Sequence, residues 1–77
     1  MTYNYTIIYE QEDKGGYHAF CPTLPGCHSY GSTIEEARKN IKEAVEAYIE
    51  SLQKDGEPIP EEKDIMVGEL KLELTSA

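Results

Sequence analysis

A single long amphipathic pattern constrains this chain more than any other feature of its sequence. Between residues 33 and 55 the apolar residues recur at spacings of three and four, which is the period of an α-helix with one buried face. Gly56 suits the position after the last turn, and Pro58 and Pro60 prevent the helix from continuing. The apolar stripe of this predicted helix comprises Ile34, Ala37, Ile41, Ala44, Val45, Tyr48, Ile49 and Leu52. Because mostly charged residues occupy the opposite face, the stripe must pack on another element.

The start of this helix has two candidate caps. Ser32 with Glu35 and Thr33 with Glu36 both fit the spacing of a capping box, in which a hydroxyl oxygen accepts a hydrogen bond from a backbone N–H of the first turn. The sequence places the helix start here and leaves the choice between the two caps open.

Three short β-strands are predicted before the helix. Residues 3–10 are rich in β-branched and aromatic types and alternate between two unequal faces, which is typical of a strand. Gly15 and Gly16 supply the positive φ angles of a hairpin turn, and residues 17–21 form the return strand. A third strand is predicted over residues 28–31. The first two strands are therefore expected to be antiparallel neighbours.

A fourth strand is predicted over residues 65–74, where leucines alternate with charged residues. The order β-β-β-α-β gives a two-layer α+β fold in which the helix packs across one sheet face. With 77 residues, the chain is expected to form a single domain over residues 1–77. One helix cannot cover both faces, so the open face or a sheet edge is expected to meet another chain. We expect a homodimer or homotetramer whose contact includes Leu70, Leu72 and Leu74.

The charge of the chain excludes some classes of ligand. Seven Lys and Arg residues stand against fifteen Asp and Glu residues, a formal net charge of −8. This charge repels a phosphate backbone, so we expect no direct binding of DNA or RNA. The sequence has no run of about 20 apolar residues and no secretion signal at its start, so we expect a cytoplasmic protein without a membrane span. In that reducing compartment Cys21 and Cys27 are expected to remain free thiols.

Three kinds of chemical site are considered and not favoured. The cysteines with His18 and His28 match no zinc-ligand spacing, and we interpret Cys21 and Cys27 as small buried thiols. Cys27 and His28 are adjacent in sequence, which is poor geometry for a catalytic dyad. The centre of the first strand holds Thr6 and its apolar neighbours, so it lacks the carboxylate that a nuclease needs there. The sequence therefore predicts no catalytic residue, no metal and no cofactor.

The loop between the second and third strands, with the helix start that follows, is the most specific motif of the chain. Leu24 is expected to plug the end of the core, Gly26 to adopt a positive φ, and Gly31 to let the chain turn into the capped helix. We predict a structural role for Pro22, Leu24, Pro25, Gly26, Cys27, Gly31, Thr33 and Glu36.

These motifs resemble those of the HicB family of antitoxins, including its short HicB-like members. The family pattern combines a Tyr-rich first strand, a Gly-Gly-Tyr return, Pro-x-Leu-Pro-Gly-Cys and a Gly-x-Thr-x-Glu-Glu-Ala helix start. The corresponding segments are residues 5–9, 15–17, 22–27 and 31–37. The resemblance implies a partial ribonuclease-H-like fold without catalytic acids. It also implies a short form, because the chain stops at Ala77, before the C-terminal DNA-binding domain that many HicB proteins carry.

The resemblance also implies a function. HicB proteins bind HicA, a small basic ribonuclease of double-stranded-RNA-binding-domain fold, and mask its catalytic surface. We therefore expect an antitoxin of a type II toxin-antitoxin system that binds a HicA-type toxin. The alternative is a stand-alone oligomeric regulatory or small-ligand-binding domain without a toxin partner. Exposed tyrosines of the sheet are candidate anchors for the toxin. The candidate acidic contacts with the toxin are Glu10, Glu12, Asp13, Glu35, Glu36 and Glu43. A solvated surface without a partner explains these acids equally well.

Overall fold

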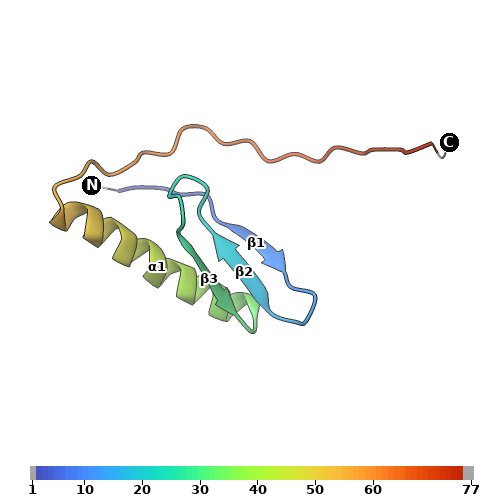
Figure 1. The fold of residues 1–77 in the computed structure, drawn as a ribbon, viewed down its shortest axis with the longest axis horizontal. Helices are drawn as coiled ribbons and strands as arrows, with labels where there is room; N and C mark the ends of the chain where they lie inside the picture. The colour runs from blue at the N-terminus through green and yellow to red at the C-terminus, as the bar shows by residue number, and fades with distance from the viewer. Residues whose placement is uncertain (1, 76–77) are drawn as a thin grey trace.

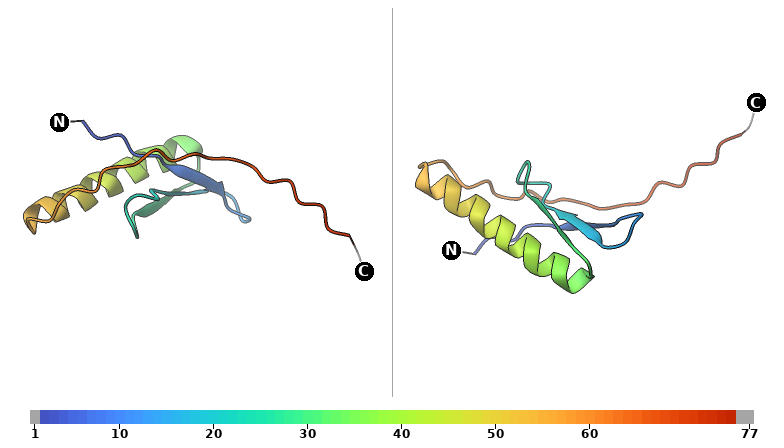
Figure 2. Two further views of the ribbon diagram at one scale, coloured as in Figure 1. Left: turned by 90° about the horizontal axis from the view of Figure 1, so that it is seen from above. Right: turned by 60° about the horizontal axis from the view of Figure 1, so that its bottom comes forward.

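The computed structural model describes residues 2–75 as a three-stranded sheet followed by one helix. The strands are β1 (Ile8–Gln11), β2 (Tyr17–Phe20) and β3 (His28–Gly31), and the helix is α1 (Ile34–Lys54). The sheet is antiparallel in the order β1-β2-β3, and α1 runs across one of its faces (Figures 1 and 2). The predicted α+β class with the helix on one sheet face is confirmed.

The hairpin between β1 and β2 is closed by the two glycines expected to do so. Gly15 and Gly16 have φ angles of 97° and 81°, a region that side chains disfavour. The Glu12 N–H donates to the Gly16 carbonyl, and the Gly15 N–H donates to the Glu12 carbonyl, each at 3.0 Å. This turn sets the register that pairs Gln11 with Tyr17.

The loop between β2 and β3 is held by its own backbone. The Cys21 N–H donates to the Cys27 carbonyl and the Cys27 N–H to the Leu24 carbonyl, both at 3.0 Å. Gly26 has a φ of 79°, and the Leu24 side chain is fully buried. The predicted plug and the predicted positive φ are both confirmed.

The junction between β3 and α1 explains why a glycine is needed at its centre. A Cβ atom on Gly31 would lie 2.2 Å from the Ala37 backbone nitrogen, so only glycine permits this approach of strand to helix. Thr33 is the N-cap, because its hydroxyl oxygen accepts from the Glu36 N–H at 3.1 Å. The Glu36 carboxylate in turn accepts from the Ser32 N–H at 3.2 Å. The structure thus decides between the two caps that the sequence left open.

The other end of the helix is closed by the glycine predicted to end it. Asp55 is the C-cap, and Gly56 follows with a φ of 66°. The Gly56 N–H donates to the Gln53 carbonyl and the Glu57 N–H to the Leu52 carbonyl, which is the Schellman pattern of a helix end.

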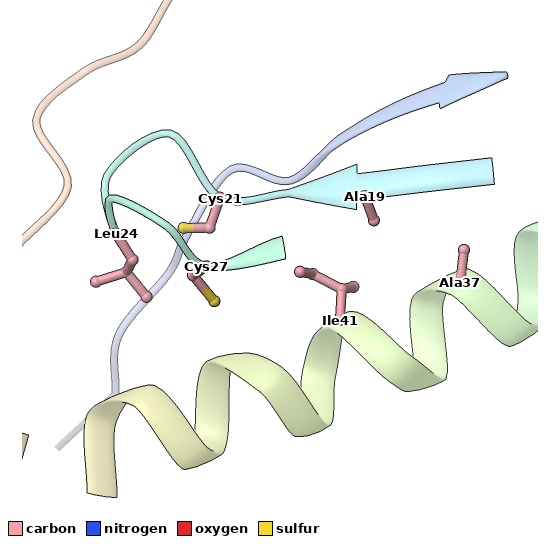
Figure 3. Packing of buried hydrophobic residues seen from close by; sticks show 6 residues of the cluster. All are labelled: Ala19, Cys21, Leu24, Cys27, Ala37 and Ile41. Carbon is pink, nitrogen blue, oxygen red and sulfur yellow. The ribbon is translucent and has the colours of Figure 1, made fainter. Parts of the chain in front are cut away.

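The core is small and lies between the sheet and the helix. Ala19 and Cys21 point from β2 and the residue after it toward Ala37 and Ile41 of α1, with Leu24 and Cys27 closing one end (Figure 3). These are the buried hydrophobic residues of the described chain. A core this thin makes each large side chain count strongly toward stability.

Two strand predictions need correction. The first strand begins at Ile8 rather than at Tyr3, because β2 ends its pairing opposite Ile8. The predicted fourth strand over residues 65–74 is not formed. Its segment departs from the sheet and projects as an extended tail (Figures 1 and 2), so it has no neighbouring strand to pair with. Leu70, Leu72 and Leu74 are 89%, 71% and 85% exposed within this single chain.

Candidate partner-binding face

The sheet face opposite the helix is uncovered. Tyr9 and Tyr17 pack against the buried core around Ala19, which places them on the helix side. Since side chains alternate along a strand, the residues between them point to the other side. The register aligns two rows of cross-strand neighbours on this open face. One row is Ile8, Phe20 and His28, and the other is Glu10, His18 and Tyr30.

Aromatic rings gather around His18 at the centre of the open face. The ring centroid of His18 lies 4.9 Å from that of Tyr30, 5.6 Å from that of Phe20 and 5.3 Å from that of His28. The Glu10 carboxylate lies 3.3 Å from His18 Nδ1. Tyr30 is 56% exposed, and the cluster therefore presents a rigid aromatic surface to solvent beside a carboxylate.

An open hollow adjoins this face where the hairpin tip meets the start of α1. Its volume is about 500 Å³, and Tyr30 lies in its wall and so links it to the aromatic cluster. Glu12 comes from the hairpin and Glu36 from the first turn of the helix. Two of the acids proposed as partner contacts are thus brought into one hollow, although they are distant in sequence.

The other proposed acids are placed differently. Glu10 lies on the open face beside His18, and Asp13 lies in the exposed hairpin turn. Glu35 is exposed in the first helical turn. Glu43 follows Glu36 by two helical turns, about 10 Å along the axis, and does not line the hollow. The structure therefore groups Glu10, Glu12 and Glu36 near Tyr30 and leaves Glu43 apart.

The expectation of several exposed sheet tyrosines is corrected. Tyr9 and Tyr17 are half-buried against the core because their strand positions face the helix, and Tyr5, which precedes β1, is half-buried against the same core. Tyr30 is the sheet tyrosine that the described chain exposes. His18, His28 and Phe20 lie on the open face with Tyr30, and this placement follows only from the strand register.

The segment after the helix makes an anchor that the sequence did not indicate. The Glu62 carboxylate accepts from the Thr6 N–H at 2.5 Å and from the Thr6 hydroxyl at 2.8 Å, and the Thr23 hydroxyl donates to it at 3.3 Å. The Tyr5 hydroxyl donates to the Pro60 carbonyl. The hydrogen bond from the Thr6 N–H lowers the pKa of Glu62, and the bonds from the Thr6 and Thr23 hydroxyls lower it further. Burial acts in the opposite direction, but the net pKa is lowered. Thr6 and Glu62 are 56 residues apart, so no local sequence pattern could have predicted this contact.

The cysteines and histidines form no metal centre in the part of the chain that the structure describes. No group of three or more His, Cys, Asp or Glu side chains lies close enough there to hold an ion. Cys21 and Cys27 are free and buried, and burial raises the pKa of the Cys27 thiol. Within residues 2–75, no helix is long and apolar enough to span a membrane.

Comparison with known proteins identifies the family. Residues 5–74 match the family described as HicB_like antitoxin of bacterial toxin-antitoxin system. The chain belongs to this family. Its HicB-like character includes the tail, since the match extends to Leu74.

Relatives and solved structures agree with this assignment. A UPF0150 protein of Synechocystis sp. is 57% identical over 70 residues, which cover 91% of this chain and 87% of the relative. The N-terminal domain of the antitoxin HicB from Burkholderia pseudomallei has a TM-score of 0.69 at 34% identity, with 77% of this chain and 69% of that chain covered. A HicA3 and HicB3 toxin-antitoxin complex contains a chain with a TM-score of 0.64 at 33% identity, with coverage of 78% and 70%. The HicB-like fold and the antitoxin family are therefore shown together.

Proposed function

We propose that this HicB-like chain is the antitoxin of a type II toxin-antitoxin system in the cytosol, and that its open sheet face binds a basic HicA-type ribonuclease. The protein then acts by occupying the surface on which the toxin holds RNA, and it performs no chemistry of its own. The observation that carries this proposal is the uncovered aromatic face around His18 and Tyr30, bordered by Glu10. The similarity to a chain in a toxin-antitoxin complex supports the same class of partner.

The aromatic cluster supplies what a tight complex needs. Tyrosine offers a large contact area with few rotatable bonds, which is why it is enriched among the anchors of protein interfaces. Tyr30 is 56% exposed, and its ring stacks on the ring of His18, its neighbour on the adjacent strand. An anchor that is already fixed in place costs less ordering entropy on binding than a mobile one.

The acids supply attraction and partner choice. A ribonuclease that holds RNA must present a basic surface, and a chain of net charge −8 offers the complementary potential. Such complementarity speeds encounter and selects partners more than it fixes the dissociation rate. Glu10 and Glu12 border the aromatic cluster, so they are the acids placed to meet basic side chains around an anchored partner. The same charge opposes binding of DNA or RNA by this chain itself.

Co-expression with the product of the neighbouring gene, which this proposal expects to be a HicA-type ribonuclease, tests the proposal. We expect growth rescue and co-purification. We expect Tyr30→Ala to weaken the complex by about 30-fold, the equivalent of about 2 kcal/mol at an interface anchor, mainly through faster dissociation. Met66→Ala is the matched control, because Met66 is 94% exposed on the tail, away from the open face.

The charged rim has its own test. Glu12→Lys is expected to slow association and to flatten its salt dependence. Glu43→Lys makes the same charge change away from the hollow and is expected to have the smaller effect. If the chain neither rescues growth nor co-purifies with a toxic neighbour, the antitoxin proposal is wrong and the stand-alone alternative stands.

We also propose that the chain self-associates. A small core and a tail of exposed apolar residues both favour burial against a second copy.

A further inference from the structure

The C-terminal tail carries an apolar pattern that the single chain leaves uncovered. Past Glu62, where Thr6 and Thr23 hold the chain, the described tail is exposed through residue 75. Its large apolar residues are 40–94% exposed, and they are Ile65, Met66, Val67, Leu70, Leu72 and Leu74. A row this apolar is unusual on a small monomer and indicates an interaction surface.

The anchor at Glu62 limits how much of the tail its own sheet can use. The tail and β1 run in the same direction (Figures 1 and 2), and β1 has a free edge because it is the outer strand of the sheet. Gln11 ends β1 five residues after Thr6, and Val67 lies five residues after Glu62. Parallel strands advance equally, by about 3.3 Å per residue. The tail beyond Val67 therefore overhangs the end of its own sheet.

The overhanging part has the alternation of a strand with two different faces. Three leucines share one side of residues 69–74, and the charged residues share the other. Lys71 Nζ lies 3.6 Å from the Glu73 carboxylate within the same chain, so opposite charges are already neighbours there. Such a segment can pair with an identical one, and a two-fold axis then fixes which residues face each other.

One antiparallel register pairs all three leucines with leucines and Lys71 with Glu73. Centring the pair on Leu70 sets Leu70 opposite its copy and Glu69 opposite Lys71, but it leaves Leu72 opposite Gly68 and Glu73 opposite Val67. Centring the pair on Lys71 sets Lys71 opposite its own copy and Glu69 opposite Glu73, which places like charges together. Any register shifted by one residue sets leucines opposite charged residues. Centring it on Leu72 sets Leu72 opposite its copy, Leu70 opposite Leu74, and Lys71 opposite Glu73. Opposite charges and apolar pairs directly across a ladder both stabilise it.

We propose that two copies of this chain pair through antiparallel contact of residues 69–74, with the two-fold axis at Leu72. This inference rests on the proposed self-association and is independent of the toxin. A two-stranded ribbon alone is marginal in water. Here each ribbon strand begins from the anchor at Glu62, which reduces the freedom that pairing must remove. The negative charge of each copy opposes the pairing, so added salt is expected to strengthen it.

Disulfide trapping of the full-length protein tests the register. Leu72→Cys is expected to give a covalent dimer on mild oxidation, since a disulfide needs Cα atoms about 4.4–6.8 Å apart. Leu70→Cys alone is expected not to link, because its two copies lie about 14 Å apart at this register. A mixture of Leu70→Cys and Leu74→Cys chains is expected to link again. Met66→Cys is the control, with its copies about 40 Å apart, and buried Cys21 and Cys27 give little background.

The outcomes separate the two proposals. A monomer by light scattering at tens of micromolar overturns self-association itself. A dimer in which Leu70→Cys links to itself while Leu72→Cys does not overturns the register and leaves self-association standing. Leu72→Glu is expected to dissociate the dimer and to retain toxin binding. If the wild-type chain is monomeric and Leu72→Glu abolishes toxin binding, the tail is part of the toxin interface and the proposal is wrong.

Discussion

Replacing Leu24 by alanine tests how much of the fold depends on the plugged loop. The Leu24 side chain is fully buried among the few residues of the core. Leu→Ala removes the equivalent of three methylene groups, worth about 2.4 kcal/mol of transfer free energy at about 0.8 kcal/mol each. The cavity left behind adds to this, so we expect a loss of about 3–4 kcal/mol. A chain of this length has about 4–12 kcal/mol of total stability, so the loss is a large fraction.

The measurement is urea unfolding followed by circular dichroism, with thermal unfolding as a second probe. We expect the melting temperature to fall by at least about 12 °C, from about 4–8 °C per kcal/mol in domains of this size. Met66→Ala is the control, because it shortens a large apolar side chain that is 94% exposed. A loss below about 1 kcal/mol for Leu24→Ala would refute the view that this side chain closes the core.

Three further predictions concern the helix junction, the anchor and the tail. Gly31→Ala is expected to destabilise the fold by about 1–3 kcal/mol or more in urea unfolding, because the added Cβ overpacks the junction of strand and helix. Gly68→Ala is the control and is expected to keep wild-type stability, because a Cβ there meets no atom within 4 Å. The lowered pKa of Glu62 means that its anchor stabilises the fold above about pH 4.5 and is lost as the pH falls through the lowered pKa. The NMR shift of the Thr6 amide reports this loss, and a midpoint at or above about pH 4.5 contradicts the prediction. In the proposed dimer residue 71 lies opposite residue 73 of the other copy, so Lys71→Glu chains and Glu73→Lys chains each place like charges together in a homodimer and opposite charges together in a heterodimer. We therefore expect a mixture of the two variants to form mainly heterodimers by native mass spectrometry. A statistical mixture contradicts the register.

Local features of the fold were predictable because their causes are local. The extent of α1, its end at Gly56 and the Gly26 turn all follow from residues within a few positions of each other, whereas the choice of Thr33 over Ser32 as the N-cap needed the structure. The alternation around Leu72 predicted a fourth strand, and this prediction was wrong for the single chain. It could not reveal that one chain offers this segment no neighbour, since pairing depends on a distant edge.

The candidate site was predictable only in part. Acids were named from charge alone, and the structure groups Glu12 with Glu36 while leaving Glu43 apart. The alternation of the first strand predicted that its tyrosines share one side. It could not show that the helix covers this side, because that depends on how the helix packs on the sheet. The exposure of Tyr30 beside His18 on the open face therefore depends on the strand register.

Titration of RNA cleavage by a purified HicA-type ribonuclease tests the central claim most directly. We predict that this protein abolishes cleavage near one equivalent when both concentrations lie far above the dissociation constant, and that Met66→Ala does the same. At concentrations near the dissociation constant of the wild-type complex, we predict that Tyr30→Ala needs at least about tenfold more protein than wild type for equal inhibition. Undiminished cleavage at a large excess of correctly folded wild-type protein would contradict the account. Equal inhibition by Tyr30→Ala under the same conditions would show that the open sheet face is not where the toxin binds.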